Sequence, residues 1–372
     1  MTSIIKDGLS LEEIQVPGFH KVVRATKPSA GLDAIIAIHD LRLGKAALGG
    51  TRIYPYASFD DALFDVTRLA EGMSYKSAIS QSGWGGGKSV IIADPKKDKT
   101  EELLIAFAEV INRLEGLYIC AEDSGCSPAD IGVIAEHTPY AVGIPHEKSS
   151  GNPSPFTAWG VFRGVQATMH QLFGSDSVAG KTVAIQGIGS VGAQLAELLF
   201  WHGAKLVLTD IHTERAEGLA KQYGAQWVEP DAIFDVPCDV FAPCAMGAII
   251  HPKTIERLRC KGIAGAANNQ LLTEADGETL HRLGILYAPD FLINSGGLIN
   301  VTEETFENGY CPFEARNKID EIYNQLRLIY RIAAEKGIST ERAAKELVGY
   351  RLQYGVGRRT APIHMHHAEM SY

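Results

Sequence analysis

Residues 182–192 read Thr-Val-Ala-Ile-Gln-Gly-Ile-Gly-Ser-Val-Gly, and this stretch decides the class of fold. Residues 182–186 are predicted to form a strand, and a helix is predicted to follow the glycines as far as about residue 202. A Gly-x-Gly-x-x-Gly run between a strand and a helix is the fingerprint of a dinucleotide-binding unit in a parallel sheet. The sequence therefore predicts a Rossmann-type, doubly wound α/β domain.

Each glycine of this fingerprint has a separate role. Gly187 permits the tight turn, Gly189 lets the backbone meet the pyrophosphate, and Gly192 allows the helix to pack closely on the strand. The start of the helix adds partial positive charge next to the phosphates. The predicted cofactor contacts therefore include the other residues of the run, which are Ile188, Ser190 and Val191.

An acidic residue after the next predicted strand, residues 205–209, indicates which dinucleotide is bound. Asp210 would hydrogen-bond the adenosine ribose hydroxyls and repel a 2′-phosphate, so NAD is favoured over NADP. Arg215 is the one feature that points to NADP.

The rest of the chain extends this unit into a two-domain protein. Strand and helix alternate from residue 181, with shorter strands predicted at 240–242, 262–264 and 285–287. A Ser/Gly/Pro-rich connector, residues 149–155, indicates a domain boundary, and a helix is expected over 157–173. We expect an N-terminal α/β substrate domain over residues 1–147, an NAD domain over 148–330, and a cleft between them.

The N-terminal part carries its own strands and helices. A strand is predicted at 34–38 and a helix over 100–116. Another helix is predicted to start at Ser58, with Asp61 as its capping-box partner. A strand over 117–121 ends directly before Glu122 and Asp123. Beyond about residue 310 the chain is predicted to be helical to about residue 354, with a break at Gly337.

Two lysines in the N-terminal part follow glycine-containing stretches. They are Lys76 in Gly72-Met73-Ser74-Tyr75-Lys76 and Lys88 in Gly85-Gly86-Gly87-Lys88. A phosphate-binding P-loop is excluded, because it needs a glycine at position 82, where this chain has Ser82, and a helix after the lysine. Residues 90–94 instead predict a buried strand. Glycines allow close backbone approach, so a lysine placed there can clamp an anion or act as a base.

These lysine stretches, together with Asp94-Pro95, resemble the signature of the glutamate/leucine/phenylalanine/valine dehydrogenase superfamily, and the leucine enzymes are the most similar branch. The resemblance covers nearly the whole chain. Ser82 replaces a usual aliphatic residue and Trp84 is bulkier than expected. The resemblance also implies that the C-terminal helices, about 331–372, pack back on the first domain. It further implies a homo-oligomer that is built from dimers, and the leucine enzymes of the family are octamers.

The resemblance implies a role for each candidate site residue. Lys76, with the amides of Gly49 and Gly50, would bind the substrate α-carboxylate, and Lys88 would be the general base, its pKa lowered by burial and a neighbouring cation. Asp123 would pair with the substrate ammonium group. Asn269 would hold the amino group or the nicotinamide amide. Further cofactor contacts are implied for Thr157, Cys244, Ala245 and Asn268.

The implied reaction is the reversible oxidative deamination of an amino acid. Hydride passes from Cα to the nicotinamide, Lys88 activates a water that attacks the imine, and collapse with proton transfer to or from Asp123 releases ammonia and a 2-oxo acid.

The substrate side chain is predicted to be apolar. Glutamate-specific relatives have a lysine before the Gly-Gly pair, where this chain has Leu48. Leucine, valine or isoleucine is expected, with phenylalanine or tryptophan as the alternative, because pocket methylenes give only about 1–3 kcal/mol of discrimination. The other residues expected to line the pocket are Met73, Ala121, Leu298 and Val301.

Composition limits the other classes of function. The 372 residues carry a formal charge of -9, which argues against a nucleic-acid or acidic-membrane binder. No apolar run is long enough for a membrane helix and no signal peptide is evident. The six cysteines lack CxxC spacing, which indicates reduced thiols in the cytoplasm. The histidines at 364–367 are expected to be incidental rather than metal ligands. A non-catalytic NAD-binding protein remains a less favoured alternative.

Overall fold

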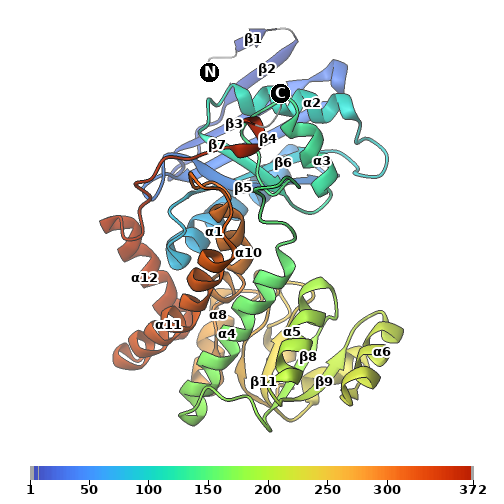
Figure 1. The fold of residues 1–372 in the computed structure, drawn as a ribbon, viewed down its shortest axis with the longest axis vertical. Coiled ribbons are helices and arrows are strands. Elements are labelled where there is room, and N and C mark those ends of the chain that lie inside the picture. The colour runs from blue at the N-terminus through green and yellow to red at the C-terminus, as the bar shows by residue number, and fades with distance from the viewer. Residues whose placement is uncertain (1–3, 7, 370–372) are drawn as a thin grey trace. The chain divides into compact units, whose positions relative to one another are not determined.

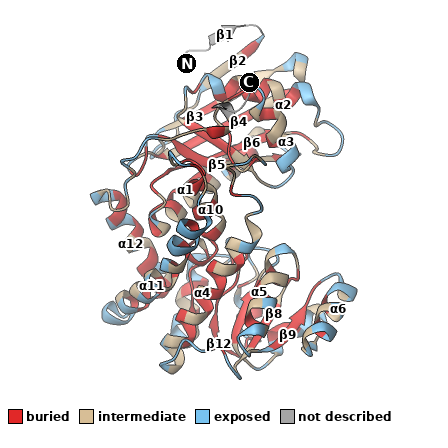
Figure 2. Ribbon diagram, in the orientation of Figure 1, coloured by how far each residue is buried: buried red, intermediate tan, exposed pale blue. Residues whose placement is uncertain are grey.

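The computed structural model describes residues 4–6 and 8–369, and the chain divides into two compact units (Figure 1). Unit 1 comprises Met1–Gly151, Val301–Pro312 and Tyr350–Tyr372, and unit 2 comprises Asn152–Asn300 and Phe313–Gly349. The first boundary lies within a few residues of the expected one. In both units the central strands are largely buried (Figure 2).

The NAD domain was expected to end at residue 330, whereas unit 2 extends to Gly349. Helix α11 (Pro312–Lys336) belongs almost entirely to unit 2, where the fully buried Tyr330 places its hydroxyl 2.8 Å from Thr168 Oγ1. Residues 331–349 also belong to unit 2, and the chain returns to unit 1 from Tyr350 onward. The predicted helix break at Gly337 is present, since Gly337 has a φ of 65°.

Unit 1 is built on a mixed seven-stranded sheet in the order β1-β2-β3-β4-β6-β5-β7. Its pairs are antiparallel from β1 to β6, whereas β5 runs parallel to both β6 and β7. The strands are β1 (Ile4–Lys6), β2 (Leu9–Glu13), β3 (Lys21–Lys27), β4 (Leu32–Asp40), β5 (Ala47–Tyr54), β6 (Gly85–Ile92) and β7 (Tyr118–Glu122). The helices are α1 (Phe59–Ser80), α2 (Glu101–Asn112), α3 (Pro128–Ala135), α13 (His366–Glu369) and a 3-10 turn (Pro28–Ala30).

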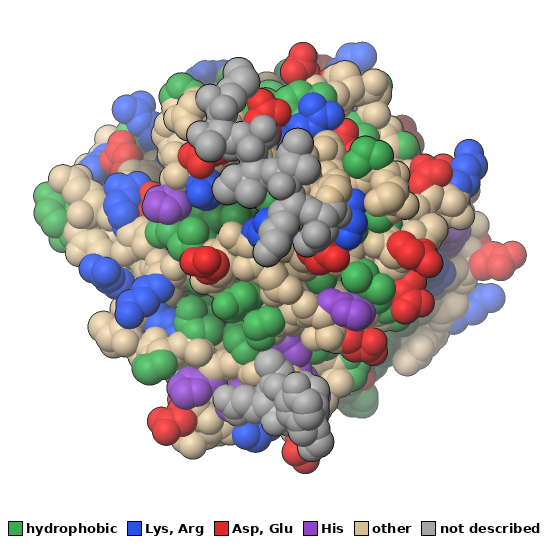
Figure 3. All heavy atoms as spheres, turned by 90° about the horizontal axis from the view of Figure 1, so that it is seen from above, with side chains coloured by type: hydrophobic (Ala, Val, Ile, Leu, Met, Phe, Trp, Pro, Cys, Tyr) green, Lys and Arg blue, Asp and Glu red, His purple; other side chains and the backbone are tan. Residues whose placement is uncertain are grey.

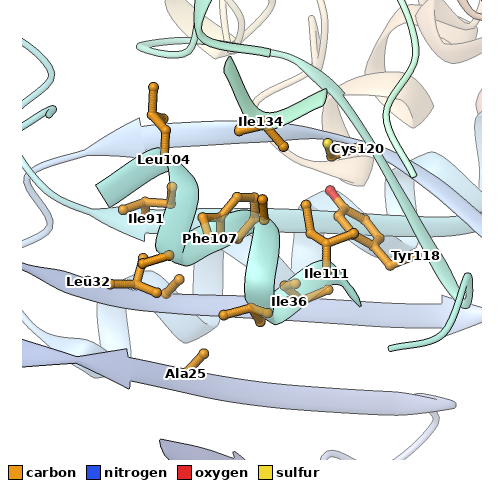
Figure 4. Close-up of a cluster of buried hydrophobic side chains, with 14 of the residues drawn as sticks. Ala25, Leu32, Ile36, Ile91, Leu104, Phe107, Ile111, Tyr118, Cys120 and Ile134 are labelled. Carbon is orange, nitrogen blue, oxygen red and sulfur yellow. The ribbon is translucent and has the colours of Figure 1, made fainter. Parts of the chain in front are cut away.

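Both faces of this sheet are buried, and successive residues of a strand enter different cores. On β4, Ile36 belongs to the large core formed with α2 and α3, in which Phe107 and Ile111 lie over the sheet (Figure 4). Its neighbour Ile35 belongs to the core under α1, together with Val66. Residues 34–38, which were predicted as a strand, are apolar throughout because β4 is covered on both faces.

Helix α1 begins and ends with side-chain contacts. The predicted cap is confirmed, since Ser58 Oγ accepts the backbone N–H of Asp61 at 3.1 Å. At the other end, the buried Arg351 donates to the carbonyl oxygens of Ala78 at 3.1 Å and Ile79 at 2.6 Å. Carbonyls of the last helical turn lack the usual helical partners, so Arg351 supplies donors there and ties the C-terminal segment to the end of α1.

The glycines before Lys88 form a strand rather than a loop. The predicted strand over 90–94 starts earlier, at Gly85, because β6 passes directly under α1 and beside β5. A Cβ on Gly86 would overlap the backbone N and Oγ of Ser74, and one on Gly87 would lie 3.0 Å from the Tyr118 ring. The glycines therefore allow close helix–strand and strand–strand packing.

Unit 2 is a six-stranded sheet in the order β10-β9-β8-β11-β12-β13, with all pairs parallel. The strands are β8 (Thr182–Gln186), β9 (Lys205–Thr209), β10 (Gln226–Trp227), β11 (Cys238–Pro243), β12 (Cys260–Ile263) and β13 (Leu286–Tyr287). The helices are α4 (Ser154–Phe173), α5 (Ser190–Trp201), α6 (Thr213–Tyr223), α7 (Pro252–Ile255), α8 (Glu274–Arg282), α9 (Asp290–Ile293), α12 (Thr340–Tyr354) and a 3-10 turn (Pro230–Asp235), with α10 (Gly296–Glu303) crossing into unit 1.

The strand order confirms the predicted doubly wound domain. From the central β8 the chain moves outward to β10 and then crosses to β11 on the other side. Ligands of such sheets bind at this switch point, beyond the carboxyl ends of β8 and β11. The predicted bounds of β8 and β9 are the observed ones.

The lengths of the described helices and the placement of possible metal ligands bear on membrane and metal roles. On the face in Figure 3, acidic and basic side chains are interspersed. In the part of the chain that the structure describes, no helix has the length and apolar composition needed to cross a bilayer. Among the same residues, no three histidine, cysteine or acidic side chains gather as metal ligands, and all six cysteines are free.

The packing of β6 under α1 makes a testable prediction. We expect Gly86→Ala to lower the free energy of unfolding by about 1–3 kcal/mol, because its Cβ would overlap Ser74. Gly72→Ala is the matched control on α1, since no heavy atom lies within 4 Å of its Cβ. That change is expected to be neutral or to stabilise by up to about 1 kcal/mol. Urea unfolding measures both, and equal effects would contradict this packing.

Candidate functional site

The side chains of Lys88 and Asp123 form an ion pair at the centre of unit 1. Lys88 Nζ lies 2.5 Å from Asp123 Oδ2, and only 9% and 22% of these side chains are exposed. Lys88 is on β6 and Asp123 directly follows β7, so β5 lies between their strands. The two side chains therefore meet across β5.

A glycine in β5 makes this meeting possible. A Cβ on Gly50 would lie 2.8 Å from Asp123 Cβ and 3.1 Å from Lys88 Nζ. Any larger residue would occupy the path between the two charges. On the other face, Gly49 packs so closely on β6 that a Cβ would overlap Gly87 O. Both glycines lie inside β5, so they are part of the sheet rather than of a glycine loop.

A second cation, Arg52, lies beside the pair. Arg52 Nε is 3.4 Å from Asp123 Oδ2, the oxygen that also faces Lys88. Burial alone would raise the pKa of the Asp123 carboxyl, but Lys88 and Arg52 outweigh this and hold the pKa below its usual value. Asp123 is therefore an anion at neutral pH.

A buried hydroxyl network fixes the three strands beneath the pair. Tyr118 of β7 donates its hydroxyl to Gly49 O at 2.7 Å and lies 3.0 Å from Ser89 Oγ of β6. Ser89 in turn donates to Thr51 Oγ1 of β5 at 3.0 Å. All of these side chains are fully buried. The network holds β5, β6 and β7 in one register, and no feature of the sequence predicted it.

The other residues expected at the substrate site in unit 1 lie on β5, α1 and β7. Leu48 is buried in β5, and Ala121, half-buried on β7, pairs in register with Gly50. Met73 and Lys76 are half-buried on α1, three residues apart, so both lie on one side of that helix.

Helix α10 carries the last two pocket candidates. Leu298 and Val301 are half-buried and one helical turn apart, and the boundary between the units falls between them. Asn269, in unit 2, is exposed and has a φ of 50°.

Two of the fingerprint glycines of unit 2 have the backbone geometry that the predicted turn and close packing require. Gly187 has a φ of 94°, a conformation that side chains disfavour. A Cβ on Gly192 would overlap Gly187 O, so only glycine permits this helix–turn contact. In contrast, no heavy atom lies within 4 Å of a Cβ on Gly189. The space that Gly189 leaves open is where the fingerprint places a pyrophosphate.

The start of α5 is suited to an anion. Its N-cap is Gly189, which supplies no side-chain hydrogen bond, so the first helical N–H groups, from Ser190 and Val191 onward, have no intrahelical acceptor. Beside them Asp210, at the end of β9, accepts the backbone N–H of Ile188 at 2.6 Å and that of His212 at 2.8 Å. The carboxylate is thus held at the place expected for a ribose contact, and the residues present fit a dinucleotide.

The two loops predicted at the nicotinamide side contact each other and the fingerprint turn. A Cβ on Gly187 would lie 2.7 Å from Ala245 Cβ, and one on Gly192 would lie 3.3 Å from Cys244 Cβ. A Cβ on Gly247 would lie 2.5 Å from Asn268 O. The predicted residues Cys244, Ala245 and Asn268 are therefore gathered at the carboxyl ends of β8, β11 and β12.

Asn294 is a residue of this region that the sequence did not reveal. Its Nδ2 donates to Asn268 Oδ1 at 2.8 Å and to Ala266 O at 3.2 Å. Its buried Oδ1 has no hydrogen-bond partner among the described residues. Thr157, another predicted cofactor contact, lies on α4, where its hydroxyl donates to Pro153 O at 3.1 Å.

Ser82 and Trp84, the two residues near Lys88 that differ from the family pattern, fit the local packing. Ser82 Oγ donates to Ser77 Oγ at 3.0 Å, which replaces an apolar contact by a hydrogen bond. Trp84 is 1% exposed, and the guanidinium of Arg359 lies 5.3 Å from the centre of its ring. The bulk of Trp84 is thus covered by the C-terminal segment.

The histidine tail contacts unit 1. His366 Nε2 lies 2.7 Å from Phe306 O, and His367 Nε2 lies 3.5 Å from Thr138 O. Burial lowers the pKa of His367. These histidines have packing roles in the described part of the tail, which ends at residue 369.

Comparisons with known proteins match both units. The family model described as "Glu/Leu/Phe/Val dehydrogenase, dimerisation domain" matches residues 19–140, and "Glutamate/Leucine/Phenylalanine/Valine dehydrogenase" matches residues 207–346. Leucine dehydrogenase of Thermoactinomyces intermedius is 47% identical over 336 residues, which are 90% of this chain and 91% of that enzyme. Phenylalanine dehydrogenase of Caldalkalibacillus thermarum is 43% identical over 347 residues, 91% of this chain and 92% of that enzyme.

A solved structure agrees with these matches. L-tryptophan dehydrogenase from Nostoc punctiforme superposes with a TM-score of 0.81 at 40% identity, covering 91% of this chain and 97% of that chain.

The open space at Gly189 makes a prediction about dinucleotide binding. Gly189→Ala is expected to weaken NADH binding at least about tenfold, because its methyl group occupies the path of the pyrophosphate. Its effect on the free energy of unfolding should stay near 1 kcal/mol, the usual cost of alanine at an N-cap. NADH fluorescence titration and urea unfolding measure the two effects. Unchanged affinity would show that the turn does not hold the dinucleotide.

Proposed function

This chain belongs to the Glu/Leu/Phe/Val dehydrogenase family and is an amino-acid dehydrogenase, and we propose that it catalyses the reversible oxidative deamination of leucine, valine or isoleucine with NAD. The products are the 2-oxo acid and ammonia. The observation that carries the proposal is the buried Lys88–Asp123 ion pair, which unites a base and a carboxylate at one point.

The proposed chemistry divides among three side chains of unit 1. Lys76 binds the substrate carboxylate, since a half-buried ammonium group on α1 attracts an anion. Neutral Lys88 takes a proton from the water that attacks the imino carbon, and the resulting carbinolamine collapses with proton transfer involving Asp123. Asp123, held as an anion, also attracts the substrate ammonium group. A bound nicotinamide dinucleotide supplies the acceptor for the hydride.

The family uses NAD or NADP, and we propose NAD for this chain. The carboxylate of Asp210 is fixed by two backbone N–H groups at the end of β9, where it would repel a 2′-phosphate. Arg215, the residue that favours NADP, is exposed on α6. Asn268, Cys244 and Ala245 are proposed to contact the nicotinamide side.

The proposed substrate has a branched aliphatic side chain. Leu48 and Ala121 present no charge to a substrate side chain, which disfavours glutamate. The leucine dehydrogenase of Thermoactinomyces intermedius is 47% identical to this chain, and the phenylalanine dehydrogenase of Caldalkalibacillus thermarum is 43% identical. Phenylalanine or tryptophan is the second candidate, since the tryptophan dehydrogenase structure superposes over nearly the whole chain. We further propose a cytoplasmic homo-oligomer built from dimers, with an octamer as one form.

The test is ammonia-dependent oxidation of NADH and NADPH with a panel of 2-oxo acids. We expect NADH and 4-methyl-2-oxopentanoate to give the highest kcat/KM, and Lys88→Ala to lower kcat by at least about 100-fold, the usual effect of losing a general base. Lys27→Ala is the matched control, because Lys27 is also a partly buried lysine of unit 1, paired with Glu109 at 2.7 Å. It should retain turnover.

Other outcomes are equally informative. Highest activity with phenylpyruvate or indolepyruvate would move the substrate to the aromatic class and keep the mechanism. NADH binding without turnover of any 2-oxo acid would refute the enzyme proposal in favour of a non-catalytic NAD-binding protein.

A further inference from the structure

We propose that Arg52 is a positioning residue that keeps Asp123 ionised while Lys88 gives up its proton. The inference deepens the proposed function and rests on it. It starts from the position of Arg52 on β5, two residues after Gly50, so that both lie on the same face of the strand. Arg52 therefore reaches the point where Lys88 and Asp123 meet.

One carboxylate oxygen faces two cations. Asp123 Oδ2 is 2.5 Å from Lys88 Nζ and 3.4 Å from Arg52 Nε. The arginine side chain is only 24% exposed, so water screens this contact incompletely. Asp123 thus has a second positive neighbour although Lys88 already pairs with it. We relate this second neighbour to a state in which Lys88 is neutral.

That state occurs in the proposed reaction. A lysine that acts as a base must lose its charge, whereas a guanidinium stays protonated at every working pH. If Lys88 were the only cation, its deprotonation would leave Asp123 buried without a counter-charge, which is costly. With Arg52 present, Asp123 keeps one positive partner in both states of Lys88.

Arg52 is itself anchored by an acidic residue of α1. Arg52 Nη1 lies 2.8 Å from Asp65 Oδ2, and the same oxygen accepts the hydroxyl of Tyr56 at 2.6 Å. Arg68 contacts the other oxygen of Asp65 at 3.5 Å. Positive and negative groups thus alternate from Lys88 through Asp123 and Arg52 to Asp65. Asp65 fixes the direction of the guanidinium and partly offsets its charge.

Among the described residues, Glu122, Cys126 and Tyr118 also lie around Asp123, and the nearby cation Lys99 is paired with Asp130 at 2.6 Å. Burial and then the charge of Asp123 raise the pKa of the Glu122 carboxyl. Burial raises the pKa of the Cys126 thiol to about 12 and that of the Tyr118 hydroxyl well above its usual value. Asp65 and Tyr56 face Arg52 from the other side. Apart from the paired Lys99, none of these neighbours supplies the positive charge that Arg52 supplies.

The chain of alternating charges predicts two opposite shifts in the pH profile of deamination. Arg52→Gln removes a cation, which makes proton loss from the Lys88–Asp123 pair harder, so the pH of half-maximal kcat should rise by about 1 unit. Asp65→Asn removes the negative charge that partly offsets the charge of Arg52, so the pH of half-maximal kcat should fall. Arg52→Lys keeps a charge at neutral pH and should restore much of the wild-type midpoint.

A matched control separates this effect from a general loss of charge. Arg24 on β3 is paired with Asp33 through contacts of 3.0 and 2.8 Å, and β4 and β6 separate its strand from β5. Arg24→Gln should therefore leave the midpoint unchanged. Circular dichroism confirms that each variant is folded before its profile is recorded.

The results distinguish the inference from the proposed function. No turnover by the wild type would refute the proposed function. With an active wild type, a lower rate of Arg52→Gln at an unchanged midpoint would refute the role of Arg52 and leave it a structural residue. Shifts of Arg52→Gln and Asp65→Asn in the same direction would refute it as well.

Discussion

Two opposite charges, on Lys88 and Asp123, are buried together in unit 1, and much of that unit can be understood from what this contact requires. The side chains come from β6 and from the end of β7, with β5 between them, so they can meet only where β5 has no side chain. Gly50 provides that gap. A buried charge is tolerated only with partners, and Asp123 has two.

The surrounding packing keeps this gap in place. Tyr118, Ser89 and Thr51 join the three strands through buried hydroxyl groups on one face of the sheet. On the other face α1 lies so close to β6 that only glycine fits at residue 86. Unit 2 also has glycines at points of close approach. In its fingerprint Gly192 lies directly against Gly187 O, and Gly189 leaves space open. In both units glycine is placed where the backbone must approach another group.

Local patterns were enough to predict the fold class. The family resemblance proposed Lys88 and Asp123 as the catalytic residues, and these two side chains lie 2.5 Å apart. The strand–glycine–helix pattern located β8 and β9 at their observed bounds, and Ser58 was correctly predicted as the cap of α1. The glycines before Lys88 could not be recognised as strand, because their role depends on α1 and β7, which come from other parts of the chain. The expected boundary at residue 330 differs from the division into units for a similar reason, since residues 313–349 belong with segments of unit 2 that are distant in the chain, as the contact of Tyr330 with Thr168 illustrates.

Arg52 and Asn294 show what a single sequence leaves hidden. Each contacts residues from other parts of the chain. Arg52 contacts Asp123 and Asp65, and Asn294 donates to Asn268. The one signal for Arg52 in the sequence was its spacing of two residues from Gly50, which places both on the same face of β5. That spacing indicates a contact with the Lys88–Asp123 pair only once β5 is known to lie between β6 and β7. The roles of the substrate and cofactor residues therefore remain proposals that depend on the charge pair.

The central claim is that the charge of Asp123 beside Lys88 is needed for the reaction. Asp123→Asn keeps the size of the side chain and removes its charge, and the ammonia-dependent oxidation of NADH by a 2-oxo acid at saturation measures the consequence. The account predicts a kcat at least about 100-fold below that of the wild type in a variant with an unchanged circular dichroism spectrum. A kcat within tenfold of the wild type would contradict it.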